Sequence, residues 1–218
     1  MQVVDLSQPL VEGMPVFPGT PEPEFHKPLL IEKDGFAETL LKLGSHTGTH
    51  VDAPAHLIAG GLFLSDFPIS AFIGPGLVLD LRGLPPGPVE PDLLEKKAAA
   101  IARVEFLLLL TSWSELWGRP DYFRDYPVLS PASARWLTGF NLKGVGVDAI
   151  SVDAHDAGEY QVHLSLLHAG ILIVENLTNL ALLTDREFIF SCLPLPLPEA
   201  DGCPVRAAAL LKVLPGLD

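Results

Sequence analysis

The chain has 218 residues, of which 48% are hydrophobic and 19% are charged, so it can form a large core and lies outside the composition of disordered proteins. The 14 basic and 27 acidic residues leave a net charge of −13, which argues against a nucleic-acid partner and against a polybasic membrane-surface protein. The 2 cysteines form no disulfide framework, and we expect a reducing, cytoplasmic location.

The sequence shows no membrane or export signal. Its unbroken aliphatic runs, such as 107–110 and 171–174, are far shorter than the roughly 20 residues that a membrane span requires. The opening MQVVDLSQPL lacks the basic and then apolar regions of a signal peptide.

The length predicts one domain over residues 1–218, because domains commonly hold about 150 residues.

Prolines and glycines divide the chain into short elements. They mark three breaks, at 9–28, 83–91 and 194–204, which we predict to be loops. Short apolar runs bounded by turn residues predict buried strands at 77–81, 104–111, 144–148 and 171–177. Helix-start residues and good helix formers predict helices at 91–102, 130–137 and 163–169. This alternation predicts a mixed α/β domain.

The segment LGSHTGTHVDAPAH, residues 43–56, places His46, His50, Asp52 and His56 within eleven residues. The intervening Thr and Gly residues and the proline disfavour a helix, and an extended chain points alternate side chains to one face. Four extended residues span about 13 Å, which is too far for two imidazoles to share an ion. We therefore predict a bent strand or loop, with the bend at Gly48.

These residue types suit a catalytic metal. Neutral imidazole and carboxylate bind Zn²⁺, Mn²⁺ or Fe²⁺, and the lack of cysteine in this segment argues against a closed structural zinc site. A catalytic metal needs about three protein ligands and keeps a position for water, whose pKa it lowers towards 7. A further histidine near the ion could move protons. The alternative is a polar, hydrogen-bonded turn.

The run HTGTHVDAPAH resembles the signature of the cyclase-like metal-dependent hydrolases, the family of bacterial kynurenine formamidase and isatin hydrolase. Four other segments are similar to the same family: DLSQPLVEGMPVFPGTPEP, GVGVDAISVDAHD, HLSLLHAGILIVENLTNL and PLPLPEADGCPVRAAAL. The resemblance implies a swivelling β/β/α domain, with a mixed β-sheet core and flanking helices.

The resemblance also implies roles for single residues. His46, His50 and Asp52 would bind a first divalent metal, and Asp52 would bridge to a second ion held by His163 and Glu175. The implied ion is Zn²⁺, with Mn²⁺ as the alternative, at one or two ions per subunit. From the residues alone, an acid closing the apolar run ILIV needs a partner if it is buried, whereas the alternative for Glu175 is a strand end facing water.

Two further positions bear on catalysis and substrate. By the same resemblance, His56 would be the proton donor and acceptor. Phe17 stands where kynurenine formamidases typically have tryptophan, so we expect its ring to line the substrate pocket with an apolar face but without an indole N–H. The implied activity is that of an arylformamidase-like amidohydrolase acting on a small molecule of the N-formylkynurenine type, a step of tryptophan catabolism.

Two other functions stay open. The same site could serve a lactam or lactone hydrolase or a cyclase, or it could belong to a non-catalytic metal- or ligand-binding protein. Family members are generally homo-oligomers, so we expect a dimer or tetramer whose subunits complete each other's pockets. Apolar residues after the motif could line the pocket or an interface: Leu62, Phe63, Phe67 and Phe72.

The remaining histidines and cysteines carry weaker hypotheses. His155 lies near a predicted strand end and is the main rival for a contact with substrate or metal. We expect His168 on the surface or in packing, and the sequence assigns no role to His26. Cys192 and Cys203 have no basic neighbour in sequence and are interpreted as buried or idle thiols.

Overall fold

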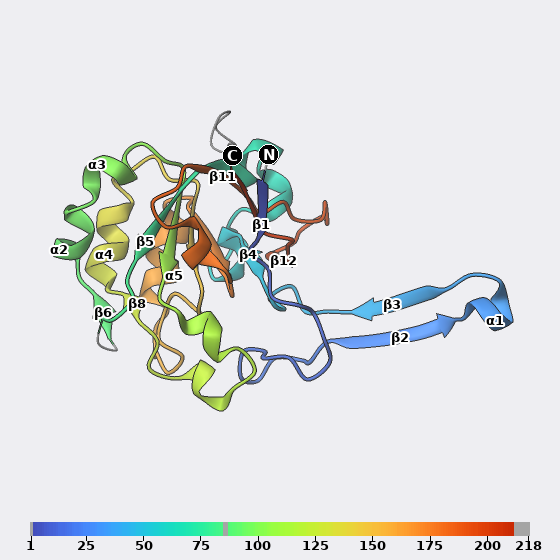
Figure 1. Cartoon of the computed structure of the whole chain (residues 1–218). Coiled ribbons are helices and arrows are strands. Elements are labelled where there is room, and N and C mark those ends of the chain that lie inside the picture. Colours follow the sequence, from blue (N-terminus) through green and yellow to red (C-terminus); the bar gives the residue numbers. More distant parts are fainter. Residues whose placement is uncertain (1, 85–86, 212–218) are drawn as a thin grey trace, which may run out of the picture.

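A nine-stranded mixed sheet forms the centre of the computed structural model, which describes residues 2–84 and 87–211 (Figure 1). Its strands are β1 (Gln2–Asp5), β4 (His50–Asp52), β5 (Ile73–Asp80), β7 (Phe106–Leu110), β9 (Gly144–Val147), β10 (Leu172–Glu175), β11 (Phe188–Ser191), β12 (Gly202–Pro204) and β13 (Ala208–Leu211). Their order in the sheet is β1, β13, β11, β5, β7, β9, β10, β4, β12. Strands β5, β7, β9 and β10 run parallel, and antiparallel strands extend the sheet on both sides.

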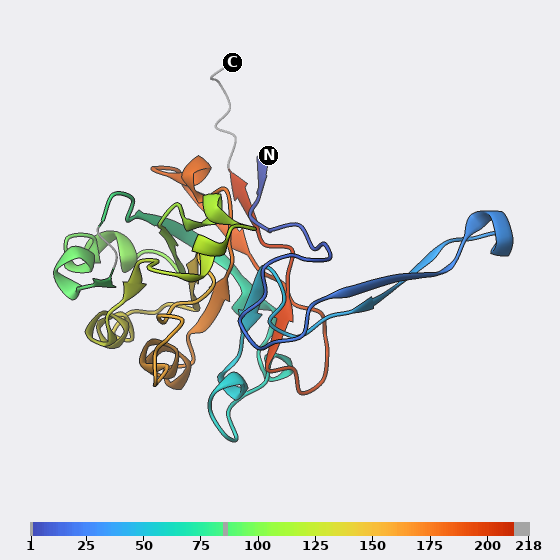
Figure 2. The ribbon, with the colours of Figure 1, turned by 90° about the horizontal axis from the view of Figure 1, so that it is seen from below.

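The four predicted strands are confirmed, and they form the parallel centre of the sheet. They correspond to β5, β7, β9 and β10, with their ends shifted by a few residues. Every residue of β7 is buried, as expected of a parallel strand that is covered on both faces. The mixed α/β class is therefore confirmed, in the form of a large curled mixed sheet with few helices (Figures 1 and 2).

Two of the three predicted helices are confirmed as α4 (Pro131–Leu137) and α5 (Gln161–His168). The Ser130 side chain caps α4 by accepting a hydrogen bond from a backbone amide of the first turn at 3.1 Å. Gly170 follows α5 with φ +73°, the left-handed conformation in which many helices end. Among the described residues, no helix combines the length and the apolar character needed to cross a bilayer.

The single helix predicted over 91–102 is wrong. The chain forms two short helices instead, α2 (Pro91–Glu95) and α3 (Ala98–Ile101). Between them, Lys97 leaves the helical region with φ −111° and ψ 5°. Leu94 and Ile101 are nevertheless both completely buried in one core, so tertiary packing overrides the helix propensity of the Lys–Ala run.

Parts of all three predicted loops are strands, and the loop predictions are wrong there. They are β2 (Glu24–Leu29), β6 (Pro88–Val89), which pairs with β8 (Val128–Leu129), and the sheet-edge strand β12. Each of these has a single neighbouring strand, and a proline is tolerated where the other edge of a strand is unpaired. Residues 85 and 86 of the second predicted loop lie outside the described residues.

The sheet separates two apolar cores. In β7, Leu107 and Leu109 face one core, and the alternate residues Phe106, Leu108 and Leu110 face the other. The first core receives side chains from α2, α3, α4 and α5. Figures 1 and 2 show α2, α3 and α4 gathered on one side of the body.

A hairpin projects from the opposite side of the body (Figures 1 and 2). It consists of β2, the short helix α1 (Ile31–Asp34) and β3 (Glu38–Lys42), which pairs antiparallel with β2. We call residues 24–42 the arm. None of its residues is buried, and all of residues 31–42 are exposed. The arm is absent from the sequence-based expectation.

Candidate metal centre

Strand β4 brings the central residues of the motif to one face of the sheet. It pairs antiparallel with β10, and the register places His50 opposite Glu175. Asp52 is two residues further along β4, so its side chain lies on the same face. The predicted bend is present, since Gly48 has φ +65°, and a Cβ there would lie 2.6 Å from the Leu10 side chain.

The five candidate ligands come from two distant segments of the chain, 46–52 and 163–175, and lie together around Asp52. Its Oδ1 lies 2.7 Å from His46 Nδ1 and 3.2 Å from His50 Nε2, and its Oδ2 lies 3.9 Å from His163 Nε2. Glu175 completes the group, with Oε2 3.5 Å from His50 Nε2 and Oε1 3.3 Å from His163 Nε2. All the residues that the sequence proposed as ligands therefore lie together.

The three histidines share one pattern of hydrogen bonding. In each ring, one nitrogen faces the carboxylates of this cluster, and the other is held from outside. The outer partners are Asp201 for His46 at 3.1 Å, the Gly48 carbonyl for His50 at 2.8 Å, and Asp153 for His163 at 2.7 Å. In the neutral form of each ring, the outer N–H is donated to an acceptor and the inner nitrogen carries a lone pair, which is the state that metal-binding histidines adopt.

The surroundings of the Asp52 carboxylate show whether a cation would fit in this cluster. Asp52 is completely buried, and among the described residues its Oδ2 has no hydrogen-bond partner. A buried carboxylate oxygen without a partner is costly. Two sets of ligand atoms, each within 4.8 Å of one another, meet at this residue: His46, His50 and Asp52 form one, and Asp52, His163 and Glu175 form the other. This nitrogen and oxygen donor set suits Zn²⁺, Mn²⁺ or Fe²⁺.

Electrostatics in this cluster hold protons on two imidazoles when no cation is present. Burial by itself lowers the pKa of His46, but Asp52 and Asp201 outweigh it and raise the pKa to about 9. Burial also lowers the pKa of His163, but the Asp153 and Glu175 carboxylates outweigh this effect and raise the pKa to about 10. A bound divalent cation would replace these protons as the positive charge.

His56 lies beside the cluster and has no short contact with Asp52. It ends a short 3₁₀ turn that begins at Pro54, and its ring lies 3.8 Å from the ring of His46, centroid to centroid. Its Nδ1 is 3.8 Å from Asp201 Oδ2. Burial lowers the pKa of His56, with the attraction of Asp52 acting against this and the charge of His46 adding to it. A neutral imidazole next to the candidate ligands can accept a proton.

A second set of hydrogen bonds supports the bend at Gly48. The Asn176 side-chain amide donates to the Gly48 carbonyl at 2.9 Å, and the Tyr122 hydroxyl donates to Asn176 Oδ1 at 2.7 Å. The Thr49 hydroxyl donates to the Asn176 backbone carbonyl at 2.7 Å. Asn176 is 1% exposed and has φ +58°. Because His50 donates to the same Gly48 carbonyl, this network fixes the orientation of its ring.

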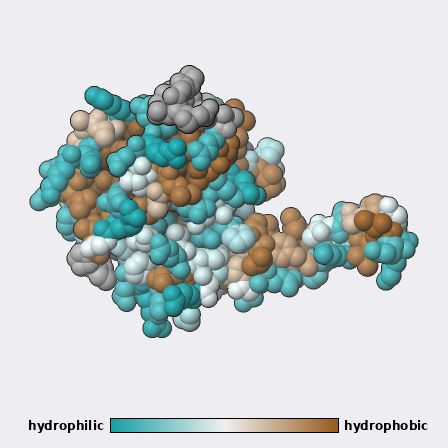
Figure 3. Space-filling model, in the orientation of Figure 1, coloured by the Kyte–Doolittle hydropathy of each residue, from teal (hydrophilic) through white to brown (hydrophobic). Residues whose placement is uncertain are grey.

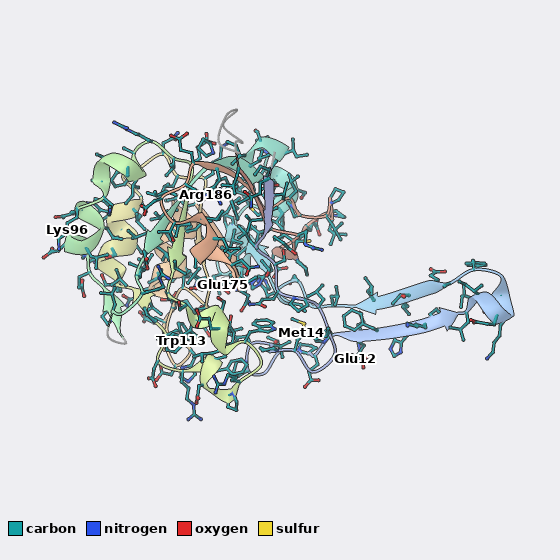
Figure 4. All side chains as sticks on the ribbon, viewed as in Figure 1. Glu12, Met14, Lys96, Trp113, Glu175 and Arg186 are labelled. Carbon is teal, nitrogen blue, oxygen red and sulfur yellow. The ribbon has the colours of Figure 1, made fainter. Side chains whose placement is uncertain are left out.

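A cavity of about 190 Å³ opens over the cluster. Its polar residues include His46, His50, His56, His163 and Glu175, and its apolar walls include Phe17, Leu57, Ile150 and Tyr160. Phe17 thus lies in the wall of this cavity, and its contact with substrate stays a prediction. In Figure 4, Glu175 lies within the body, whereas Glu12 and Met14 mark the base of the arm.

Other residues that the sequence considered lie elsewhere. His155 and His168 are exposed, and His155 lines a different hollow beside Asp156. His26 is exposed on the arm, 3.2 Å from Glu24. Cys192 and Cys203 are buried free thiols, as expected, and burial raises the pKa of both.

Four apolar residues that the sequence analysis named after the motif lie outside the lining of this cavity. Leu62 is exposed, Phe63 is half-buried, Phe67 packs against the second core, and Phe72 belongs to that core. Of the two alternatives given for them, lining of the pocket is wrong for this cavity, because the chain leaves it after Leu57, and the interface alternative stays a prediction. The water-facing alternative for Glu175 is also wrong, since this side chain is 6% exposed.

Sequence reasoning missed three supporting residues: Asp153, Asn176 and Asp201. Asp201 contacts His46 across 155 positions, and Asp153 contacts His163 across 10. Asp153 follows a predicted strand and precedes a predicted helix, which is a usable signal for a helix-terminus acceptor. It accepts from the backbone amides of Val162 and His163 at 3.0 and 2.9 Å.

Comparison with known proteins links this geometry to enzymes. The family model described as "Putative cyclase" matches residues 4–154. The kynurenine formamidase of Bacillus mycoides (strain KBAB4) is 34% identical over 211 residues, which cover 94% of this chain and 96% of that protein. An isatin hydrolase bound to the product analogue thioisatinate has a TM-score of 0.87 and 26% identity, covering 97% of this chain and 93% of its own. A potential metal-dependent hydrolase with cyclase activity has a TM-score of 0.77 and 25% identity, covering 98% and 99%.

Proposed function

This chain belongs to the cyclase family and is a metal-dependent hydrolase of the arylformamidase type, and we propose that its substrates are N-formyl aromatic amines such as N-formylkynurenine. The similarity to kynurenine formamidase extends over nearly the whole chain, which supports this substrate class. The reaction adds one water across the amide C–N bond and yields formate and the free aromatic amine.

One observation carries the proposal. Three imidazoles, each held from outside by an acceptor, direct their inner nitrogens at two buried carboxylates under a cavity with apolar walls. A structural polar cluster would satisfy its own acceptors, whereas the buried Asp52 Oδ2 lacks a partner among the described residues. The cavity also gives a small molecule access to the cluster. This combination supports an enzyme over a non-catalytic binding protein.

We assign the metal to the five clustered ligands. His46, His50 and Asp52 would hold a first ion, and Asp52 would share a second with His163 and Glu175. Zn²⁺ is the preferred ion and Mn²⁺ the alternative, because both accept imidazole and carboxylate together. A divalent metal bound there supplies Lewis-acid activation of water and of the amide carbonyl.

His56 is the proposed proton-transfer residue. It borders the cavity without joining the ligand cluster, and its lowered pKa leaves the ring neutral at pH 7. A neutral ring can take the proton from the attacking water and return it to the leaving nitrogen, which departs as an amine. Asp201, 3.8 Å from His56 Nδ1, is placed to hold the ring while it carries the positive charge.

The cavity walls fit an aromatic substrate. Phe17, Leu57 and Tyr160 present apolar surface around the polar residues, and we propose that Phe17 contacts the aryl ring. A formyl group is the smallest acyl group, so its carbonyl can reach the polar floor while the ring stays against the walls. Phe17 lacks the N–H of an indole and therefore contributes contact area alone.

The direct test is hydrolysis by purified protein loaded with Zn²⁺ or Mn²⁺. We expect N-formylkynurenine and simple formanilides to be converted to formate and amine, with loss of activity in a chelator and recovery when metal is restored. A protein that binds metal but hydrolyses neither formanilides nor cyclic amides contradicts the proposed function.

A second substrate class is favoured by one comparison. The isatin hydrolase structure matches 97% of this chain, which supports a cyclic aryl amide as an alternative substrate for the same site. The same hydrolysis would then open a ring and release no second product. Product mass separates the alternatives: hydrolysis adds one water, and a dehydrative cyclase would remove one.

We also propose a homo-oligomer, a dimer or tetramer, and a cytoplasmic location. Two buried free thiols agree with a reducing compartment. The exposed apolar side chains of the arm agree with an oligomer.

A further inference from the structure

A third set of ligand atoms lies beside the five clustered residues. The side-chain ligand atoms of His46, His56 and Asp201 all lie within 4.8 Å of one another. His46 also belongs to the first proposed ion site, whereas His56 and Asp201 belong to neither of the two sites described above. We call His46, His56 and Asp201 the outer site.

The outer site has the spacing of a coordination sphere. Asp201 Oδ2 lies 3.1 Å from His46 Nε2 and 3.8 Å from His56 Nδ1. When Zn²⁺ binds four ligands in a tetrahedron with bonds of about 2.1 Å, any two ligand atoms are about 3.4 Å apart. One observed distance is slightly shorter than this value and the other is slightly longer. Small side-chain movements would therefore let one cation contact all three residues.

The backbone fixes the two residues that only the outer site uses. Asp201 directly precedes β12, and its backbone carbonyl accepts a hydrogen bond from the Ala53 amide at 2.8 Å. Ala53 is followed by the 3₁₀ turn that ends with His56. The rings of His46 and His56 lie 3.8 Å apart, centroid to centroid, with 36° between their planes. Both rings can therefore direct a nitrogen at the same carboxylate oxygen.

A cation can reach the outer site from solvent. The side chains of His46, His56 and Asp201 are 20%, 29% and 42% exposed, whereas that of Asp52 is 1% exposed. Figure 3 shows many hydrophilic residues on this view of the body, and the whole chain has a net charge of −13. A negative protein raises the local concentration of cations at its surface. The outer site is thus accessible even when the buried sites are filled.

We propose that the outer site binds a further divalent cation, Zn²⁺ in preference to Mn²⁺, and that this ion inhibits the hydrolase. The inhibition rests on the proposed function, because it takes His56 as the proton-transfer residue. With Nδ1 bound to a cation, the neutral His56 ring keeps its one proton on Nε2 and cannot accept another. Zn²⁺ is preferred because two of the three ligands are imidazoles, which bind Zn²⁺ more strongly than Mn²⁺.

The outer site is the weakest of the three. When His46 Nδ1 faces the first ion, its Nε2 carries the proton that is donated to Asp201 at 3.1 Å. A cation in the outer site must compete with this proton, and it is also repelled by the ion on the other side of the same ring. The buried sites therefore fill first, and the outer site fills only when Zn²⁺ is in excess.

The test is equilibrium dialysis of the metal-free full-length protein against Zn²⁺, with bound metal measured by elemental analysis and without substrate. Beyond the tight ions of the buried sites, we expect one further ion that binds at least about 100-fold more weakly. His56→Ala should keep the tight ions and lose the further ion. Asp201→Asn, which keeps the shape of the side chain, should lower the affinity for the further ion at least about 10-fold.

The chain offers a matched control for these variants. His155 Nδ1 lies 3.9 Å from Asp156 Oδ1, nearly the same separation as in the His56–Asp201 pair. This second pair lies in a different hollow, away from the cavity over the metal cluster. His155→Ala should therefore bind the further ion with the affinity of the wild type. Circular dichroism checks that each variant keeps its fold.

Hydrolysis gives a second readout for the inhibition. The rate of formanilide hydrolysis by the wild type should rise as the buried sites fill and then fall over the Zn²⁺ concentrations at which the further ion binds. Mn²⁺ over the same range should cause no such fall. Asp201→Asn, whatever its own maximal rate, should lose the fall at these Zn²⁺ concentrations.

Three results would overturn the proposal. The first is a wild type without a further ion, or with one that His56→Ala and Asp201→Asn both bind as the wild type does. The second is loss of the further ion in His155→Ala, which would place it at the surface pair. The third is a further ion that binds and leaves the hydrolysis rate unchanged, which contradicts the inhibition. Because dialysis needs no substrate, it tests the outer site even if the protein fails to hydrolyse formanilides, and a missing further ion leaves hydrolysis as a separate question.

Discussion

Glu175 faces His50 across two antiparallel strands, with Glu175 Oε2 3.5 Å from His50 Nε2. The two residues are far apart in the sequence, and the pairing of β10 with β4 alone brings them together. Because side chains alternate along a strand, a slip of one residue in this pairing would move His50 and Asp52 to the opposite face. The candidate metal centre is therefore a product of sheet register as much as of the histidine motif.

Replacing the shared carboxylate should abolish metal binding. Asp52→Asn keeps the side-chain shape but removes the charge that faces His46, His50 and His163. We expect bound metal to fall to less than about one tenth of the wild-type content and hydrolysis to fall at least 100-fold, as expected for loss of a ligand common to two sites. Elemental analysis of dialysed protein measures the first effect. A variant that keeps full metal content and full rate would contradict the assignment of Asp52.

His56 should be required for turnover and not for metal binding. His56→Ala removes the proposed proton carrier, and general acid–base groups contribute about 10²–10⁴-fold to rate. We expect kcat to fall within that range while metal content stays at the wild-type level. His155→Ala is the control, since His155 is exposed and outside the cavity, and it should match the wild type. An equal fall of kcat in His56→Ala and His155→Ala would contradict the proposed role of His56 in proton transfer.

The network around Asn176 should tune metal affinity. Asn176→Asp keeps the size and the tolerance for φ +58° but replaces an N–H donor with a carboxylate that repels the Gly48 carbonyl. We expect metal affinity to fall about 10- to 100-fold, the usual cost of losing an outer partner of a metal site. Tyr122→Phe removes only the outer hydroxyl and should have a smaller effect. A chelator competition titration measures both, and unchanged affinity in Asn176→Asp would exclude this positioning role.

The sequence predicts the parts of this molecule that depend on local pattern. Apolar runs locate the four parallel strands, and the spacing of His46, His50 and Asp52 around Gly48 predicts a bent segment with three ligand side chains. These features depend on side-chain alternation and on the conformational freedom of glycine, both of which can be read from neighbouring residues.

Long-range contacts account for what the sequence does not predict. Asp201 reaches His46 only because β12 joins the edge of the sheet beside β4, and proline-rich sequence conceals that strand. The arm is equally hidden, since its strands contain a proline and have no buried face to impose alternation. Its large exposed apolar residues become informative only when the structure shows them lying away from the core.

Gly202 should be essential for the position of His46. A Cβ at this residue would lie 2.5–2.9 Å from three atoms of the His46 ring, so Gly202→Ala must displace the imidazole. We expect a loss of metal affinity of at least about 10-fold, because a ligand moved by even a fraction of an ångström no longer fits the coordination sphere. Gly158→Ala is the matched control, since nothing lies within 4 Å of a Cβ there. Equal metal affinity in both variants would mean that His46 is not a ligand.

Metal binding should release protons. In the metal-free protein at pH 7, His46 and His163 are protonated, because neighbouring carboxylates raise their pKa values to about 9 and about 10. Because the two rings belong to the two proposed ion sites, filling both sites must displace both protons, so we expect release of about two protons per chain at full occupancy and weaker binding as the pH is lowered.

Titration calorimetry in buffers of different ionisation enthalpy measures this number. The sign of the accompanying stability effect also follows: a raised pKa stabilises the metal-free fold fully below pH 6.5, and this contribution is lost as the pH rises through 9 and 10. The metal-loaded protein should lack that alkaline loss, since its positive charge no longer depends on protons. Binding without proton release at pH 7 would show that the cation occupies a site away from these two histidines.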